Sequence, residues 1–352
     1  MIGFLRHKPS GCQWYRIQHP MDALNRAGTS TKLIGINEDI EDTDMDKIHA
    51  FQFYGAYPFS VGRVLKYLKE KGKKIVYDCD DALNLVDPTN PWYYDVMKDL
   101  GSVREILSYA DEITVSTPQM GEYIKTQSDV KVSILPNCYS QREWTFPRPN
   151  RKGLRIGYSG SASHVSDLIP ILPVIKKLQD KYNFTFILFG FGNEGLQKDY
   201  KNWYMDYRYV SSPEGQKELE IFDKLLSEIR FEWVPYVDFE KYPATLTNIA
   251  LDIGLCPLKD TPFNRCRSAC KAMEYTLSGA LALASDIEPY RTEPTSVLVT
   301  DWESTLEYYI THLEECKATK EKHLEWLRQN RNIDDKIELL KEIYNESDMP
   351  KV

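Results

Sequence analysis

The stretch NRCRSACKAMEYTLSGALALASDIEPY, residues 264–290, decides the fold. Basic and small polar residues lead into a short amphipathic run that carries Lys271 and Glu274. Gly279 then predicts a helix end, and the small apolar run ALALAS (280–285) predicts a buried strand. Cations and free backbone N–H groups at a helix start bind phosphate, and a carboxylate about one turn further in can hold a sugar diol. The stretch therefore predicts a nucleotide-sugar pocket.

Short apolar runs alternate with helical patterns along the rest of the chain. In the first half the predicted strands are 2–5, 31–36, 50–54, 73–81, 112–117 and 131–137. In the second half they are 154–161, 184–190, 231–237, 251–258, 280–285 and 296–299. Helices are predicted over 12–28, 61–71, 100–111, 118–127, 167–182, 216–229 and 239–250, and two charged helices over 303–345. This alternation indicates an α/β fold with parallel sheets covered on both faces.

Residues 141–153, QREWTFPRPNRKG, interrupt the alternation and are typical of an interdomain linker. A chain of 352 residues fits about two domains. We therefore expect two Rossmann-like domains that face a central cleft, one over 1–147 and one over 148–315 that carries the predicted nucleotide-sugar pocket. The tail, 316–352, is expected to pack back towards the N-terminal domain.

The composition is that of an ordinary globular protein, with 42% hydrophobic and 27% charged residues. The net charge of −8 argues against a general nucleic-acid coat protein, which needs a basic face. The lysines of 65–74 are either a solvated helix end or part of a local basic track. The 23 tyrosines and 7 tryptophans pack the core and surface or stack on sugars.

The cysteines and the N-terminus predict a cytoplasmic location. The seven cysteines form no CxxC pair, and Cys266 and Cys270 have no second Cys/His pair with which to bind zinc. Free thiols in a reducing compartment are expected. The first residues, MIGFLRHKPSG, are too short and charged for a signal peptide, and no apolar run approaches the ~20 residues of a membrane span. Any membrane contact would be peripheral.

Ligands of open α/β sheets collect at the carboxyl ends of strands. Asp78, Asp80 and Asp81 follow a predicted buried strand, where three carboxylates repel one another unless they are solvated, paired or metal-bound. Three roles are open to them. Asp81 caps the helix that follows, the carboxylates bind magnesium, or they accept hydrogen bonds from hydroxyls of the sugar or the acceptor. SGSASH (159–164) is either a plain turn or a diphosphate cradle that ends at His164.

Lys271 and Glu274 are three residues apart, so both lie on one face of the predicted helix. They form a surface ion pair worth a few tenths of a kcal/mol, or they belong to a site. The rest of this helix is small and apolar, which favours the site.

At these residues the sequence resembles the glycosyltransferases of the GT-B architecture, closest to the large retaining group called family four. In that family a helical Glu is followed by Gly-x-Pro-Val-Val-Ala-Ser, and KAMEYTLSGALALAS (271–285) matches with Glu274 and Gly279. The resemblance spans nearly the whole chain in order, because it also covers ADEITVST (110–117), ILPNCYS (134–140), RIGYSGSASH (155–164) and DIGLCPL (252–258).

The resemblance implies a role for each matching residue. Glu274 would bind the nucleotide ribose, and Lys271 with Arg265 would neutralise the diphosphate. Gly160 and Ser161 would approach the phosphates, and Asp80, Asp81 and His164 would act at the catalytic centre by orienting the sugar or the acceptor. Gly11 and Arg16 would lie on the acceptor side. The chain departs from the family at Cys266, where a Glu is usual, at Leu281, where a Pro is usual, and in lacking the Arg…Lys pair after the first strand of the second domain.

The implied activity is transfer of a sugar from a nucleotide diphosphate sugar to an acceptor hydroxyl with retention of configuration. No metal or other cofactor is expected, and a UDP-sugar is favoured as donor over a GDP-sugar. The expected acceptor is a glycan or a lipid-linked glycan. The alternatives are the same chemistry on a hydroxymethylated DNA base, a nucleotide-sugar 2-epimerase and a ligand-binding protein without chemistry.

Overall fold

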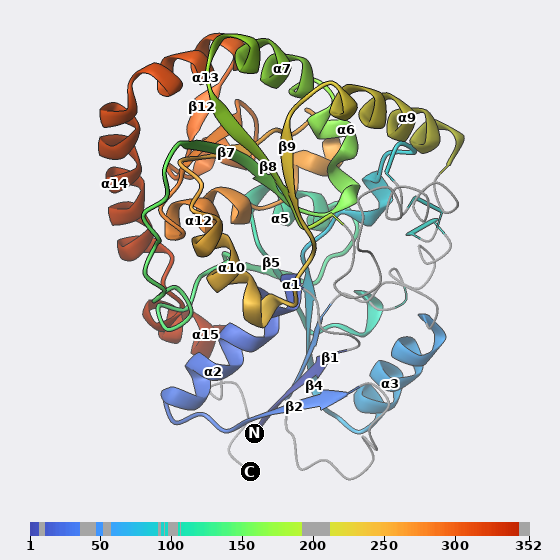
Figure 1. The fold of residues 1–352 in the computed structure, drawn as a ribbon. Coiled ribbons are helices and arrows are strands. Elements are labelled where there is room, and N and C mark those ends of the chain that lie inside the picture. The colour runs from blue at the N-terminus through green and yellow to red at the C-terminus, as the bar shows by residue number, and fades with distance from the viewer. Residues whose placement is uncertain are drawn as a thin grey trace.

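The computed structural model describes residues 1–6, 11–35, 47–51, 58–90, 93–94, 96–97, 105, 107–191 and 212–344. Two six-stranded sheets form its frame, one in the lower part of Figure 1 and one in the upper part. Every pair of neighbouring strands is parallel. The α/β class predicted from the alternation is confirmed.

The first sheet has the order β2-β1-β3-β4-β5-β6. Its strands are β1 (Ile2–Arg6), β2 (Thr31–Gly35), β3 (Lys47–Phe51), β4 (Lys74–Cys79), β5 (Glu112–Val115) and β6 (Lys131–Ile134). β4 and β5 are buried almost throughout, as their apolar, β-branched sequences predict. Residues 52–54 of the third predicted strand lie outside the described residues.

The second sheet has the order β12-β11-β10-β7-β8-β9, so the chain starts in the middle and winds outwards on both sides. Its strands are β7 (Leu154–Ser159), β8 (Phe184–Phe189), β9 (Phe231–Val234), β10 (Ile253–Cys256), β11 (Leu281–Ser285) and β12 (Val297–Val299). Gly279 has a φ of +85°, a left-handed conformation that suits glycine, and it ends the helix before β11 as predicted.

Helices cover both sheets. Those of the first half are α1 (Gly11–Gln13), the π-helix η1 (Trp14–Gln18), α2 (His19–Arg26), α3 (Pro58–Glu70) and α5 (Pro118–Lys125). Those of the second half are α6 (Val165–Leu168), α7 (Leu172–Lys181), α9 (Pro213–Ser227), α10 (Tyr242–Ile249), α11 (Pro262–Arg265), α12 (Cys270–Leu277), α13 (Trp302–Thr311), α14 (Leu313–Asn330) and α15 (Ile337–Ile343). Of the helix predicted over 100–111, residues 100–104 and 106 lie outside the described residues, and residues 105 and 107–109 are helical.

Three predicted helices differ from those observed. The helix over 12–28 contains the π-helical turn η1. The helix over 167–182 is divided into α6 and α7 near Pro170, because proline removes a backbone donor and crowds the preceding turn. The tail forms three helices instead of two: His312, with φ −124° and ψ 60°, separates α13 from α14, and Asn332 caps a new turn before α15.

The end of the chain returns to the first sheet. In Figure 1, α14 runs down one side of the molecule and α15 lies beside α2. Ile333, Leu340 and Ile343 share an apolar cluster with Phe4 and Ile17 of the first sheet and its helix. The tail therefore covers apolar surface at the N-terminal end of the chain. The residue limits 1–147, 148–315 and 316–352 stay predictions.

Candidate functional site

A cleft of about 820 Å³, measured with its opening to solvent, lies where strands of both sheets end. From the first half it is lined by Gly11, Cys12, Tyr15, Asp80, Asp81 and Asn137. From the second half it is lined by His164, Phe239, Leu258, Arg267, Ser268, Cys270, Lys271, Glu274 and Tyr290. Most of these residues follow the carboxyl end of a strand, which is where ligands of open α/β sheets bind. The cleft thus gathers six of the ten predicted site residues.

Lys271 lies in the first turn of α12 and reaches across to the end of β7. Its Nζ donates to the carbonyl of Ser159 at 2.6 Å and lies 4.5 Å from the centre of the Tyr158 ring. Burial lowers the pKa of Lys271. The site also requires glycine at Gly160, because a Cβ there would lie 2.5 Å from the Tyr158 hydroxyl and 2.6 Å from Nζ of Lys271. Among the residues that the structure describes, no side chain caps the N-terminus of α12, which leaves its first N–H groups available to an anion.

Glu274 follows one turn later on α12, and both of its oxygens accept hydrogen bonds from tyrosines. Tyr15, from η1 in the first half, donates to Oε1 at 2.8 Å, and Tyr242 at the start of α10 donates to Oε2 at 2.9 Å. Burial raises the pKa of Glu274. Because Lys271 and Glu274 each have other partners and do not pair, the surface ion pair considered from the sequence is wrong.

Arg267, and not Arg265, brings a guanidinium into the cleft. Arg265 ends α11 and is exposed, where it makes a two-pronged ion pair with Asp260 at 2.5 and 2.8 Å. Arg267 lies two residues further, lines the cleft, and has its guanidinium carbon 5.5 Å from the centre of the Phe263 ring. Its guanidinium makes no hydrogen bond or ion pair within the described part of the chain.

The three aspartates at the end of β4 have separate environments: Asp78 lies in the strand, and Asp80 and Asp81 follow it. Asp78 is fully buried and pairs with Arg16, whereas Asp80 and Asp81 line the cleft. Burial, reinforced by Asp81 and Asp78, raises the pKa of Asp80 to about 8. Asp81 does not cap the following turn, since the cap residue is Ala82 and no side chain caps it. Among the described residues, no cluster of three or more His, Cys, Asp or Glu side chains is placed to hold a metal ion.

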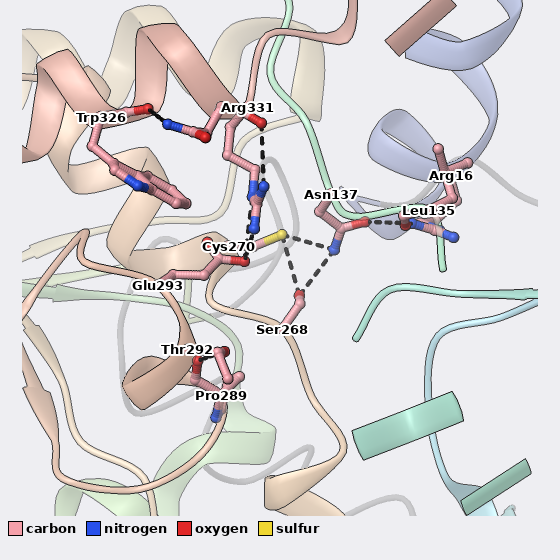
Figure 2. A network of polar contacts seen from close by, with 11 residues as sticks. Arg16, Leu135, Asn137, Ser268, Cys270, Pro289, Thr292, Glu293, Trp326 and Arg331 are labelled. Carbon is pink, nitrogen blue, oxygen red and sulfur yellow. Dashed lines mark hydrogen bonds and ion pairs between the residues drawn. The ribbon is translucent and has the colours of Figure 1, made fainter. Parts of the chain in front are cut away.

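Arg16 lies beneath the cleft instead of facing it. Its Nε and Nη2 donate to the two oxygens of Asp78 at 2.9 and 2.7 Å, and its Nη1 donates to the carbonyl of Leu135 and to Asn137. The series of hydrogen bonds continues from Asn137, as Figure 2 shows: its Nδ2 donates to the Ser268 hydroxyl at 2.9 Å and to the Cys270 sulfur at 3.0 Å. Arg16 therefore holds a cleft residue that bonds across to the start of α12.

His164 is buried, and its Nδ1 lies 2.7 Å from Oδ2 of Asp167. Burial and the nearby charge of Arg267 lower the pKa of His164 to about 4. Ser161 is exposed and bonds to Ser163, and the N–H of Gly160 donates to the carbonyl of Phe189. In this structure, the Gly160 amide and the Ser161 hydroxyl thus have protein partners, and neither residue lines the cleft.

Aromatic rings form the wall near Glu274. Phe239 lies 5.5 Å from Tyr242 and 5.5 Å from Tyr15, stacked on the first and edge-on to the second. Tyr290 closes another side. Other large rings, such as Tyr77 and Tyr275, are fully buried in the core. Core packing is confirmed for the buried rings, whereas stacking on a sugar stays a prediction for the rings that line the cleft.

No protein-family model matches the sequence, and no curated protein matches it. Solved structures do match over almost the whole chain. An α-glucosyltransferase in complex with UDP-glucose and DNA has a TM-score of 0.66 at 10% identity, covering 97% of this chain and 98% of that one. HepE of Anabaena, in complex with UDP, has a TM-score of 0.60 at 12% identity, covering 97% and 99%. The starch synthase IV catalytic domain of Arabidopsis thaliana, bound to ADP and acarbose, has a TM-score of 0.64 at 10% identity, covering 97% and 98%.

The chain has the GT-B fold. The order of the strands in both sheets and the cleft between the sheets agree with this architecture of two Rossmann-like domains. None of the described helices is long and apolar enough to cross a membrane.

Proposed function

We propose that this GT-B chain is a glycosyltransferase that moves a sugar from a nucleotide diphosphate sugar to an acceptor hydroxyl, with retention of configuration. One observation carries the proposal: Lys271, Arg267 and the uncapped N-terminus of α12 surround one cleft together with Glu274. Two cations and open N–H groups suit a diphosphate, and a carboxylate one helical turn away suits a ribose diol.

The diphosphate would take its charge neutralisation from Lys271 and Arg267. The bond between the sugar C1 and the phosphate oxygen breaks, and negative charge gathers on the leaving diphosphate, which fixed cations in a buried site stabilise. A bond between C1 and the acceptor oxygen forms on the same face of the sugar. The acceptor proton passes to the leaving phosphate, so no protein nucleophile is required.

The ribose would bind Glu274 by replacing one or both tyrosine hydroxyls, because both carboxylate oxygens already accept a hydrogen bond. The rings of Phe239 and Tyr290 offer flat surfaces for a base or a sugar. Asp80, Asp81 and His164 would orient the transferred sugar or the acceptor. Asp80, protonated up to a pH near its pKa of about 8, is able to donate a hydrogen bond as well as accept one.

A glycan is the acceptor that the surroundings favour. A neighbouring hollow of about 600 Å³ shares Arg267 with the cleft and is also lined by Asp167, the partner of the cleft residue His164. Its polar walls offer many hydrogen-bond partners to a polyol: Asp87, Thr89, Asn90, Ser163, Ser166, Lys259, Thr261 and Asn264. A hydroxymethylated DNA base is the second candidate, because the α-glucosyltransferase among the similar structures is bound to DNA. Arg16 offers no charge to a DNA phosphate, because it is buried in its pair with Asp78.

Nucleotide binding tests the proposal first. UDP, GDP, ADP and CDP and their sugars are added to the full chain, and the melting temperature is measured. A ligand at 100 times its Kd should stabilise the fold by about 2.7 kcal/mol. Lys271→Met and Glu274→Gln should abolish the shift and the transfer. Lys320→Met is the matched control, because Lys320 also donates to a carbonyl, that of Gly279 at 2.9 Å, but outside the cleft.

Reaction products separate the alternatives. The binding nucleotide sugar, labelled in its sugar, is incubated alone, with oligosaccharides and with duplex DNA containing hydroxymethylcytosine. Label in the oligosaccharide or the DNA identifies the acceptor class. An epimer formed without any acceptor would identify a 2-epimerase, and binding without release of nucleotide under any condition would identify a binding protein. Equal activity in Lys271→Met and Lys320→Met would refute the assigned site.

A further inference from the structure

His164 and Asp167 form a pair that joins the start of α6 to the segment after β10, beside the cleft. Nδ1 of His164 lies 2.7 Å from one carboxylate oxygen of Asp167, and the other oxygen accepts the backbone N–H of Lys259 at 2.7 Å. A carboxylate only accepts hydrogen bonds, so the proton of the neutral ring lies on Nδ1. Nε2 then carries the lone pair, and it makes no hydrogen bond with any residue that the structure describes.

The groups that face His164 come from four elements. Asp167 lies on α6, the Tyr158 ring of β7 is edge-on at 6.2 Å, Arg267 follows α11, and Lys271 lies in the first turn of α12. Burial and the two cations lower the pKa of His164 to about 4, against the opposing effect of Asp167. The ring is therefore neutral at pH 7, and it lines the same cleft as the two cations, Arg267 and Lys271.

We propose that His164, positioned by Asp167, binds a proton at Nε2 when a diphosphate donor enters the cleft and releases it when the nucleotide leaves. The inference rests on the proposed function. The proton comes from solvent, and no covalent bond changes other than this N–H bond. One negative charge about 4 Å from an imidazole in a partly buried site raises its proton affinity on the order of a thousandfold. The imidazolium then adds a third positive charge to those of Lys271 and Arg267.

Titration calorimetry in buffers of different ionisation enthalpy measures this proton. UDP-glucose is titrated into the full chain at pH 7 in PIPES and in Tris, and the difference in observed heat gives the protons bound per ligand. The diphosphate of a nucleotide sugar is esterified at both ends and has no group that titrates near pH 7, so the count reports the protein. We expect uptake of about half a proton or more, none in His164→Gln, and unchanged uptake in His312→Gln, whose histidine bonds to Thr311 on an exposed helix end.

Asp167→Asn distinguishes positioning from simple support of the loops. An amide at this position can donate to Nδ1, which moves the proton of the neutral ring to Nε2 and removes the lone pair from the cleft. Proton uptake should then be lost although His164 is still present, whereas a purely structural role would weaken binding and leave the proton count per bound ligand unchanged.

The outcomes are distinct. Binding of UDP-glucose by the wild-type chain without proton uptake overturns the inference and leaves the proposed function standing. Full uptake in His164→Gln also overturns it, because another group would then bind the proton. If neither UDP-glucose nor GDP-mannose gives any heat of binding, and the nucleotide panel gives no thermal shift, both the inference and the proposed function are overturned.

Discussion

Replacing Asp78 by alanine is expected to lower the free energy of unfolding strongly, because the change leaves the Arg16 guanidinium buried without its counter-ion. Both side chains have 0% of their surface exposed. Two hydrogen bonds of 2.9 and 2.7 Å join them, and the Thr114 hydroxyl donates to the same carboxylate at 2.5 Å. Burial alone would lower the pKa of Arg16, but Asp78 outweighs burial and raises it, so the guanidinium stays charged.

The expected loss follows from what remains around Arg16. Removing one partner of a buried ion pair costs about 3–5 kcal/mol. Arg16 keeps the Leu135 carbonyl and Asn137 as acceptors, which places the loss near the lower end, at about 3 kcal/mol. For domains of this size the melting temperature should fall by roughly 6–12 °C.

Urea and thermal unfolding followed by circular dichroism measure the change. Asp334→Ala is the control, because its pair with Arg26 is partly exposed and should contribute at most about 1 kcal/mol. The double variant Arg16→Met/Asp78→Leu should regain most of the stability, since apolar residues of similar size often replace a buried pair without loss. If Asp78→Ala destabilises no more than Asp334→Ala, Arg16 is not the buried anchor described above, and an acceptor-side role for it becomes open again.

Three further predictions concern the cleft and its histidine. Gly160→Ala should weaken nucleotide binding at least tenfold by titration calorimetry, because its Cβ would displace Lys271; unchanged affinity would contradict this role of the glycine. Tyr15→Phe should tighten UDP binding about 5- to 10-fold, since one competing hydrogen bond to Glu274 is lost, and equal or weaker binding would contradict competition. Stability should fall as the pH drops from 6.5 to about 4. The pKa of both His164 and His323 is lowered by burial to about 4, so over this pH range the unfolded chain binds protons that the native state does not. Urea titrations at several pH values should show the free energy of unfolding falling with pH in the wild type, and falling less steeply in His323→Gln.

Local sequence patterns predicted the strands well, because strands of a parallel sheet buried on both faces are short apolar runs bounded by turn residues. The run KKIVYDCDD (73–81) contains β4, and ALALAS (280–285) contains β11. The glycine stop at Gly279 was equally local, because its left-handed φ of +85° suits a residue without a Cβ. The elements and their order predicted two parallel α/β domains, the family resemblance implied the GT-B fold, and the structural comparisons confirm both.

The side-chain contacts of the site could not be predicted in the same way, since they join residues far apart in the sequence. Arg16 and Asp78 are 62 residues apart, and Tyr15 and Glu274 are 259 apart. Nothing near Arg16 in the sequence indicates that a buried carboxylate will meet it. Arg265 and Arg267 are two residues apart and equally basic, so the sequence does not distinguish them. In the structure α11 ends at Arg265, and of the two only Arg267 lines the cleft.

Glu274 connects ligand binding to the contact between the two halves of the chain. Several bonds cross between them, among them Tyr15 to Glu274 at 2.8 Å, Asn137 to Ser268 at 2.9 Å and Thr117 to the Cys266 carbonyl at 3.1 Å. Of these three, only the first uses a group that the donor is proposed to bind. If the ribose replaces the Tyr15 hydroxyl, donor binding breaks one bond across the cleft and leaves the other two in place. Under that condition, a change such as Tyr15→Phe, which removes the Tyr15–Glu274 bond and leaves the carboxylate in place, strengthens donor binding by the free energy of the lost bond.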